Sequence, residues 1–451
     1  MQTKKDLYQA HKLMTQRVTL ALLQGKPGAA ESPLRRTGVG ALCGVMVVVL
    51  VAAGFGITGL LFKGGARNLE QPGLVLIEKE TGAAYAYSAD QKRLIPFLNY
   101  TSARLAMSGN NIQRKLVSSR SLAKYARGPL TGIPNAPESL PDPSKLVRAP
   151  WSLCVHTPPS STIATPVVSL IGGRDTGGRP LTDTQAVLVQ GGPQTWLIWR
   201  NTRMRISRQS TRLLTNAPPP QVDERWLNGL PQGPDYAPPP IPNRGALAQP
   251  TPDGRTPTIG QVYRIPPIAG STERWYVQLS DGISGISKTQ AGLLLSLPGA
   301  RTAIDITPAA ATNISTTNLF NRQLPESPPT ALPYEPSEPL CAVYSDTSLT
   351  ARFTIGGTLP PPPATRSSID QIVLPGGATF AGTLTAPNQQ PQSFSLITEQ
   401  GVRYPIPTPE DATKLGYTPT KSAQVPANIL QLFRQGPALT STAAVRPVPA
   451  T

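Results

Sequence analysis

The chain has 451 residues, a formal net charge of +17 at pH 7, and 52 prolines and 39 glycines, which together make up more than a fifth of it. This proline and glycine content is well above the average of about 12% and predicts many short strands and turns with few long helices. The charge beyond the first 36 residues is spread thinly, without a helix-turn-helix or ribonucleoprotein motif. We therefore predict no nucleic-acid partner.

An uncharged apolar stretch runs from Thr37 to Phe62. At a rise of about 1.5 Å per residue, a helix of this length exceeds the hydrocarbon core of about 30 Å, so we predict one transmembrane helix over 37–62. A cleaved signal peptide is the alternative, but its apolar run is about 7–15 residues long and begins closer to the N-terminus.

Seven basic residues precede the apolar stretch, and only Lys63 and Arg67 follow it closely. The positive-inside rule therefore places residues 1–36 in the cytoplasm and everything after Phe62 outside. The cytoplasmic segment is predicted to form an amphipathic helix. Its side chains Leu7, Leu13, Val18 and Leu22 are expected toward one side.

The three cysteines agree with this topology. Cys43 lies inside the apolar stretch and is expected to be an inert thiol, whereas Cys154 and Cys341 lie in the exterior part, where an oxidising compartment favours pairing. We predict a Cys154–Cys341 disulfide that stabilises the folded domain by roughly 5 kcal/mol. A zinc site from Cys154, His156 and Cys341 lacks a fourth ligand and paired spacing, so no metal is predicted.

Four exterior segments share one pattern, a hairpin with an aromatic second strand, a short third strand and a short helix. The predicted repeats cover 72–112, 186–217, 261–300 and 378–440, the last including the C-terminal tail. Their aromatic residues are Tyr85, Trp196, Trp275 and Phe394, and the helix leucines expected to face inward are Leu105, Leu213, Leu294 and Leu415. Turns are expected at Gly82, Gly191-Gly192, Gly270 and Asn388.

Between these repeats, the sequence predicts a central β domain and a connector. Segments 150–175 and 340–377 each contain alternating apolar residues and one exterior cysteine, so we expect one sheet built from both halves and joined by the disulfide. Segment 218–257 contains Pro-Pro-Pro twice and is predicted to be an extended connector. The expected fold class is therefore a transmembrane helix plus an elongated, quasi-two-fold α+β domain.

Catalytic motifs are absent from the sequence, with one near match. Histidine occurs only at His11 and His156, and there is no Gly-x-Ser-x-Gly elbow. The run from Gly282 to Lys288 and Thr289 follows a predicted strand and precedes a helix, as a phosphate-binding loop does, but serine replaces the glycine required before the lysine. We treat it as a degenerate candidate and predict neither catalytic residues nor a cofactor.

Several motifs resemble the EccB family of type VII (ESX) secretion systems over nearly the full length. They are Tyr8-Gln9-Ala10-His11-Lys12, Gly82-Ala83-Ala84-Tyr85, Ser102-Ala103-Arg104-Leu105, the run from Arg127 to Pro134, Trp151-Ser152-Leu153-Cys154, Leu415-Gly416-Tyr417, and Gln435-Gly436-Pro437-Ala438-Leu439. The run from Arg127 is the most specific of them. The resemblance implies four peripheral repeats, a central β domain and one disulfide.

The resemblance also implies a location in the inner membrane with a periplasmic C-terminal domain. The implied partners are EccC, EccD, EccE, the mycosin protease and further copies of the same chain. We therefore expect a structural component that scaffolds and oligomerises the exterior part of an export complex. The alternatives are an extracytoplasmic ATPase of the same system, an activity proposed for the family, and a cell-wall binding module.

Overall fold

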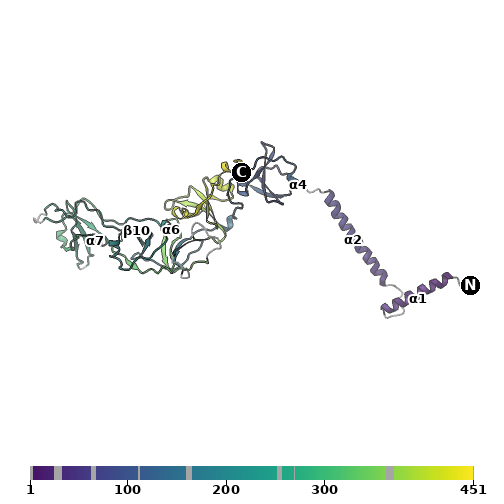
Figure 1. Ribbon diagram of the computed structural model, residues 1–451, viewed down its shortest axis with the longest axis horizontal. Coiled ribbons are helices and arrows are strands. Elements are labelled where there is room, and N and C mark those ends of the chain that lie inside the picture. Colours follow the sequence, from purple (N-terminus) through teal and green to yellow (C-terminus); the bar gives the residue numbers. More distant parts are fainter. Residues whose placement is uncertain are drawn as a thin grey trace. The chain divides into compact units, whose positions relative to one another are not determined.

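The computed structural model describes residues 4–24, 33–61, 68–109, 112–158, 165–250, 256–268, 270–361 and 370–449 (Figure 1). The chain forms two compact units, Met1–Arg67 and Asn68–Thr451.

The first unit consists of helices α1 (Lys4–Gln24) and α2 (Pro33–Leu61). The 29 residues of α2 give a helix about 43 Å long. Its segment Thr37–Ile57 is long and apolar enough to cross a membrane, and no other helix in the described ranges meets that condition. The predicted span begins at Thr37 inside α2, whereas its predicted end, Phe62, lies outside the described residues.

Helix α1 exposes the large apolar side chains Leu7, Leu13, Met14, Val18 and Leu22. With 3.6 residues per turn, Leu7, Met14 and Val18 lie along one side, and Leu22 lies close to them. Leu13 lies about 140° around the helix from Val18, so it does not share their face as expected. The segment 1–36 is helical from Lys4 to Gln24 and again from Pro33, and the remainder lies outside the described residues.

A six-stranded sheet forms the centre of the second unit, with the strand order β18-β6-β5-β16-β17-β7. Its strands are β5 (Trp151–His156), β6 (Val167–Gly172), β7 (Arg179–Pro180), β16 (Leu340–Tyr344), β17 (Arg352–Ile355) and β18 (Gln371–Val373). The expected central sheet built from both halves of the chain is therefore present. Trp151, Leu153 and Tyr344 on one of its faces belong to the largest buried cluster.

Four smaller sheets correspond to the four repeats. In repeat 1 the elements are β1 (Leu74–Glu78), β2 (Ala84–Ser88), β3 (Arg93–Phe97), α3 (Tyr100–Ala106), β4 (Gln113–Val117) and α4 (Ser119–Leu122), followed by a 3-10 turn at Pro143–Lys145. In repeat 2 they are β8 (Gln185–Gly191), β9 (Gln194–Trp199), β10 (Thr202–Ile206), α5 (Arg208–Thr211), α6 (Glu224–Asn228) and β15 (Thr330–Leu332).

Repeat 3 contains β11 (Val262–Ile265), β12 (Arg274–Gln278), β13 (Ile283–Ile286), α7 (Lys288–Leu295), β14 (Ile304–Asp305) and a 3-10 turn at Pro308–Ala310. Repeat 4 contains β19 (Ala378–Leu384), β20 (Phe394–Thr398), β21 (Val402–Ile406), α8 (Pro409–Lys414), a 3-10 turn at Pro419–Lys421, β22 (Ala423–Pro426), α9 (Ala427–Leu430), β23 (Arg434–Gln435) and α10 (Ser441–Ala444). The structure therefore bears out an α+β fold of several sheets.

Each repeat extends beyond the hairpin, third strand and helix expected from the sequence. A further strand returns parallel to the first one, as β4 does beside β1 and β22 beside β19. A short helical turn and an extended segment parallel to the third strand then follow, for example at Arg127, opposite Leu94. Repeats 1 and 3 therefore continue past the predicted ends at 112 and 300.

The predicted connector 218–257 belongs largely to repeat 2. Gln221 bridges β8, Gln232 and Tyr236 bridge β10, and α6 lies between these contacts. Trp226 in α6 is fully buried and donates its Nε1 hydrogen to the carbonyl oxygen of Leu153 in the central sheet, at 3.0 Å. The proline content gives the segment its extended backbone, but burial of Trp226 makes it part of the core rather than a spacer.

The repeats pack in two pairs. Leu105 and Ile133 of repeat 1 share a buried cluster with Phe380 and Leu415 of repeat 4. Leu293 of repeat 3 joins the cluster of repeat 2, whose parallel strand β15 follows repeat 3 in the chain. Repeat 3 is therefore inserted within repeat 2.

Three of the four helix leucines face inward as expected. Leu105, Leu294 and Leu415 are buried, but Leu213 is 43% exposed. Helix α5 ends at Thr211, so Leu213 lies beyond it, and the neighbouring Leu214 packs against the core of repeat 2 instead.

Candidate functional site

The two exterior cysteines face each other across the central sheet. Cys154 in β5 is directly opposite Cys341 in β16, and a disulfide joins their Sγ atoms. Both residues are fully buried in a small cluster with Ile171 and Val343. His156, the third residue considered for a zinc site, is half-buried, and burial lowers its pKa. Among the described residues, no three His, Cys, Asp or Glu side chains are grouped so that they could hold a metal.

The degenerate phosphate-loop candidate is a strand rather than a loop. Ile283–Ile286 forms β13, which pairs with β12 on one side, while Ile283 exchanges main-chain hydrogen bonds with Asn313 and Ser315 on the other. Gly282 has φ +157°, and a Cβ there would lie 2.6 Å from the Asn313 carbonyl oxygen. Close packing of this neighbouring segment accounts for the glycine.

The N-terminus of α7 is satisfied by protein groups. Ser287 and Gln290 form a reciprocal capping box, and the Thr289 N–H donates to the carbonyl oxygen of Glu326 at 3.1 Å. Phosphate binding at a helix N-terminus needs these N–H groups to point at the ligand. Lys288 is paired too, since its Nζ lies 3.1 Å from Glu273 Oε2. The arrangement stabilises repeat 3 and leaves few donors for a phosphate.

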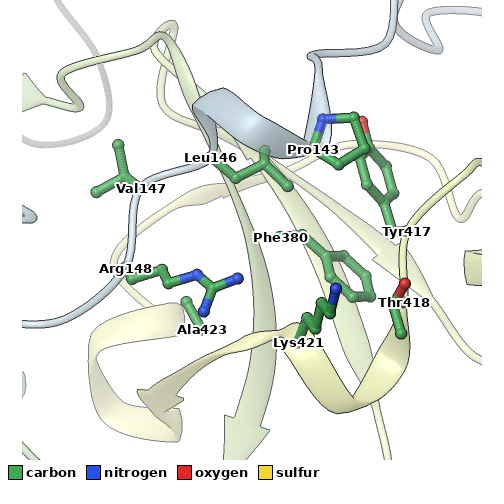
Figure 2. Close-up of a pocket in the computed structure, with 9 residues that line it drawn as sticks. All are labelled: Pro143, Leu146, Val147, Arg148, Phe380, Tyr417, Thr418, Lys421 and Ala423. Atoms are coloured by element: carbon green, nitrogen blue, oxygen red, sulfur yellow. The ribbon is translucent and has the colours of Figure 1, made fainter.

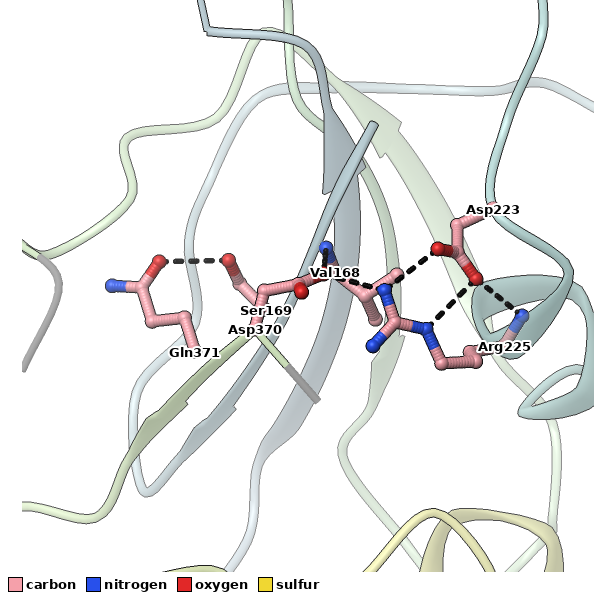
Figure 3. Close-up of polar contacts among 6 residues, drawn as sticks. All are labelled: Val168, Ser169, Asp223, Arg225, Asp370 and Gln371. Atoms are coloured by element: carbon pink, nitrogen blue, oxygen red, sulfur yellow. Dashed lines mark hydrogen bonds and ion pairs between the residues drawn. The ribbon is translucent and has the colours of Figure 1, made fainter. Parts of the chain in front are cut away.

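An ion cluster fastens repeat 2 to the edge of the central sheet (Figure 3). Arg225 in α6 donates Nη2 hydrogens to Asp223 at 2.7 Å and to Asp370 at 2.8 Å, and Asp370 accepts from the Val168 N–H at 2.9 Å. The hydrogen bond to Asp223 and the nearby charges raise the pKa of Arg225. Because one guanidinium holds carboxylates from two distant segments, the cluster fixes α6 and β18 beside β6.

A small cavity lies in repeat 4 beneath the segment that leads into the central sheet (Figure 2). Its volume is about 40 Å³, and its lining residues are Pro143, Leu146, Val147, Arg148, Phe380, Tyr417, Thr418, Lys421 and Ala423. The rings of Phe380 and Tyr417 stack with their centroids 5.0 Å apart. A cavity of this size accommodates about a water molecule and no substrate of ordinary size.

Comparison with known proteins gives a match along almost the entire sequence. A family model described as "Type VII secretion system ESX-1, transport TM domain B" matches residues 1–448. The chain belongs to this EccB family. The match includes α2, which fits the transmembrane domain in the family's description.

Curated relatives carry the same family name. The chain is 30% identical over 450 residues to the "ESX-2 secretion system ATPase EccB2" of Mycobacterium tuberculosis, covering 91% of this chain and 88% of the relative. It is 28% identical to the "ESX-3 secretion system ATPase EccB3" of Mycolicibacterium smegmatis, covering 90% and 83%.

Solved structures share the EccB fold. A chain of an intact ESX-5 inner membrane complex superposes with a TM-score of 0.62 at 23% identity, covering 100% of this chain and 96% of that one. A chain of the EccB3 dimer from the ESX-3 core complex gives 0.62 at 24% identity, covering 82% and 99%. At these sequence identities, both matches show that the fold is shared.

Two EccB-like motifs that are far apart in sequence meet in the structure. Arg104, from the motif at 102–105, donates its Nε hydrogen to the carbonyl oxygen of Lys414, next to the motif at 415–417. Gly416 has φ +89°, and a Cβ there would lie 2.6 Å from Nη2 of Arg104. These family-like residues therefore form the contact between repeats 1 and 4.

Sequence reasoning missed a concentration of arginines in repeat 2. Arg200, Arg203, Arg205, Arg208 and Arg212 fall within thirteen positions and have no acidic residue among them. The net charge was averaged over the whole exterior part, which concealed this run. The net charge in a short sliding window would have revealed it.

Proposed function

We propose that this EccB-family protein is a structural component of a type VII secretion complex of the inner membrane. Helix α2 anchors it, residues before α2 face the cytoplasm, and the unit from Asn68 onward lies in the periplasm. The observation that carries this proposal is the family match over residues 1–448, which takes in both the apolar helix and the exterior unit.

The internal construction of the exterior unit suits a scaffold. The repeats share buried clusters in pairs, and a disulfide joins the two halves of the central sheet. Arg225 pairs with both Asp223 and Asp370, which lie far apart in the sequence. These links between distant segments hold the parts of the unit in fixed positions, as a scaffold requires.

The proposed partners are EccC, EccD, EccE, the mycosin protease and further copies of this chain. Support comes from the solved relatives, one described as part of an intact ESX-5 inner membrane complex and another as an EccB3 dimer. On this proposal, α1 carries the cytoplasmic contacts, since its exposed Leu7, Met14 and Val18 form an apolar side that its own unit does not cover.

Native purification tests the scaffold role. The full chain and a variant lacking Lys4–Gln24 are expressed in the source cell with an affinity tag, and the proteins that co-purify in mild detergent are identified by mass. We expect the deletion to lose EccC and EccD while the variant stays in the membrane. Recovery of the complete complex with the deletion variant would contradict the proposed role of α1 in cytoplasmic contacts.

ATP hydrolysis is the second candidate, because the curated relatives carry the word ATPase in their names. The purified full chain and Lys288→Ala are compared for phosphate release from ATP in detergent. The capped N-terminus of α7 predicts no release that depends on Lys288. A robust rate abolished by Lys288→Ala would establish the enzymatic role instead.

A further inference from the structure

The second strand of every repeat carries a large aromatic residue, but its neighbour on the third strand differs in repeat 2. Tyr85 lies opposite Pro96, Trp275 opposite Ile286 and Phe394 opposite Ile406. Trp196 instead lies opposite Arg205. Arginines also lie over the rings of repeats 1 and 3, where Arg127 covers Tyr85 and Arg264 on the first strand covers Trp275. Repeat 2 differs in placing its arginine on the third strand, opposite the ring.

A second guanidinium shares the same ring. The guanidinium carbon of Arg203 lies 4.6 Å from the centroid of Trp196, and that of Arg205 lies 5.6 Å from it. A guanidinium over an indole is attracted to the face of the ring and can still donate hydrogen bonds from N–H groups at its edge.

This pair of charges lacks an acidic partner in the part of the chain that the structure describes. Arg200, by comparison, lies 3.4 Å from Asp183, and Arg225 is held by Asp223 and Asp370. Arg203 donates to Asn228 Oδ1 at 3.3 Å, but its Nε is buried without a hydrogen-bond partner. Burial and the neighbouring Arg205 lower the pKa of Arg203, as expected for two like charges held together.

A polar groove adjoins the pair through Asn228. It has a volume of about 330 Å³, lies between α6 of repeat 2 and α9 of repeat 4, and is lined by Arg225, Asn228, Asn428, Gln431 and Leu432. Side-chain amides both donate and accept hydrogen bonds. A polypeptide main chain offers matching N–H and C=O groups, whereas a phosphate polymer has no donors for the amide oxygens.

We propose that Arg203 and Arg205, stacked on Trp196, bind carboxylates of an acidic polypeptide segment whose main chain lies in the groove beside Asn228. Guanidinium groups form paired, charge-assisted hydrogen bonds with carboxylates. Arg203 is half-buried, which strengthens its interactions, and Arg205 is exposed and accessible to a ligand. This site goes beyond the scaffold role, which would hold without it.

Binding to a defined probe tests the site. A fluorescent peptide of alternating glycine and glutamate is titrated with the full chain in detergent, alongside its glycine and glutamine counterpart and inorganic polyphosphate. We expect the acidic peptide to bind more tightly than either comparison ligand. Arg205→Gln should weaken that binding about tenfold or more. Arg205→Lys should weaken it less, because lysine keeps the charge but lacks the paired N–H groups of a guanidinium.

Two further variants separate the site from general charge attraction. Arg120→Gln removes another exposed arginine, from α4 in repeat 1, and should leave the affinity unchanged. Asn228→Ala should weaken peptide binding without altering the charge. Failure of the full chain to bind the peptide, an equal loss with Arg120→Gln, or tighter binding of polyphosphate that depends on Arg205 would each overturn the proposal.

Discussion

Arg104 in α3 donates its Nε hydrogen to the carbonyl oxygen of Lys414 in α8 at 2.6 Å, although the two residues are 310 positions apart. Lys414 is the last residue of α8, so the guanidinium satisfies a carbonyl at the negative end of a helix. This contact joins the first and last repeats at the point where two family-like motifs meet.

Replacing Arg104 by alanine is expected to loosen the contact between repeats 1 and 4. A hydrogen bond to a charged group contributes about 1.5–3 kcal/mol, so the free energy of unfolding should fall by about 2 kcal/mol. Amide hydrogen exchange of the full chain should become faster in α8 and α10. Arg120→Ala, on the exposed part of α4, is the control, and unchanged exchange in Arg104→Ala would contradict the assigned role.

Gly282→Ala is expected to destabilise repeat 3 whether or not nucleotide is present. A Cβ at this position would lie 2.6 Å from a main-chain oxygen, and φ is +157°. The expected loss is about 1–3 kcal/mol, measured by chemical denaturation with and without ATP. Gly292→Ala in α7 is the control, since its Cβ would meet nothing within 4 Å. A loss of stability seen only in the presence of ATP would indicate that this segment binds phosphate.

The sequence predicted the local part of each repeat but not its long-range part. The hairpins and their aromatic strands were predictable, because turn residues such as Gly82 and alternating side chains act over a few positions. The returning strands were not, because β14 has only two residues and β15 pairs with a strand that lies far earlier in the chain. Strands this short carry no periodicity, and only their long-range partners define them.

In the candidate site, too, features set by local sequence were predictable and features set by long-range packing were not. The cysteines were identified by compartment and composition, and their opposition in β5 and β16 follows from the shared central sheet. Trp226 was not identified, since its proline-rich surroundings indicated an extended connector. Its burial depends on a sheet whose strands come from both halves of the chain.

The Cys154–Cys341 disulfide should account for a large part of the stability of the exterior unit. The two residues are separated by 187 positions, and on the chain-entropy model closure of such a loop contributes about 5 kcal/mol. The double variant Cys154→Ser and Cys341→Ser should show a correspondingly lower free energy of unfolding. Alkylation of intact cells should label neither cysteine in the natural chain, and ready labelling of both would contradict the periplasmic placement.

Acid should weaken the contact between Asp223 and Arg225 at the start of α6. Burial opposes ionisation of Asp223, but hydrogen bonds from Arg225 outweigh it and hold the pKa of Asp223 below its usual 3.8. A carboxyl group whose pKa is lower in the folded state stabilises the fold above its unfolded pKa, and that contribution disappears as pH falls through the folded pKa. Stability contributed by Asp223 should therefore be complete near pH 6 and decline below about pH 4.

The measurement is the free energy of unfolding as a function of pH for the natural chain and for Asp223→Asn. The variant should be less stable at neutral pH, and the difference should shrink as the pH falls below about 4, because the natural carboxylate then takes up a proton. Asp183→Asn is the matched control, since Asp183 forms an exposed ion pair with Arg200 and such pairs contribute about 0–1 kcal/mol. A constant difference across the acid range would show that Asp223 acts through packing rather than through its charge.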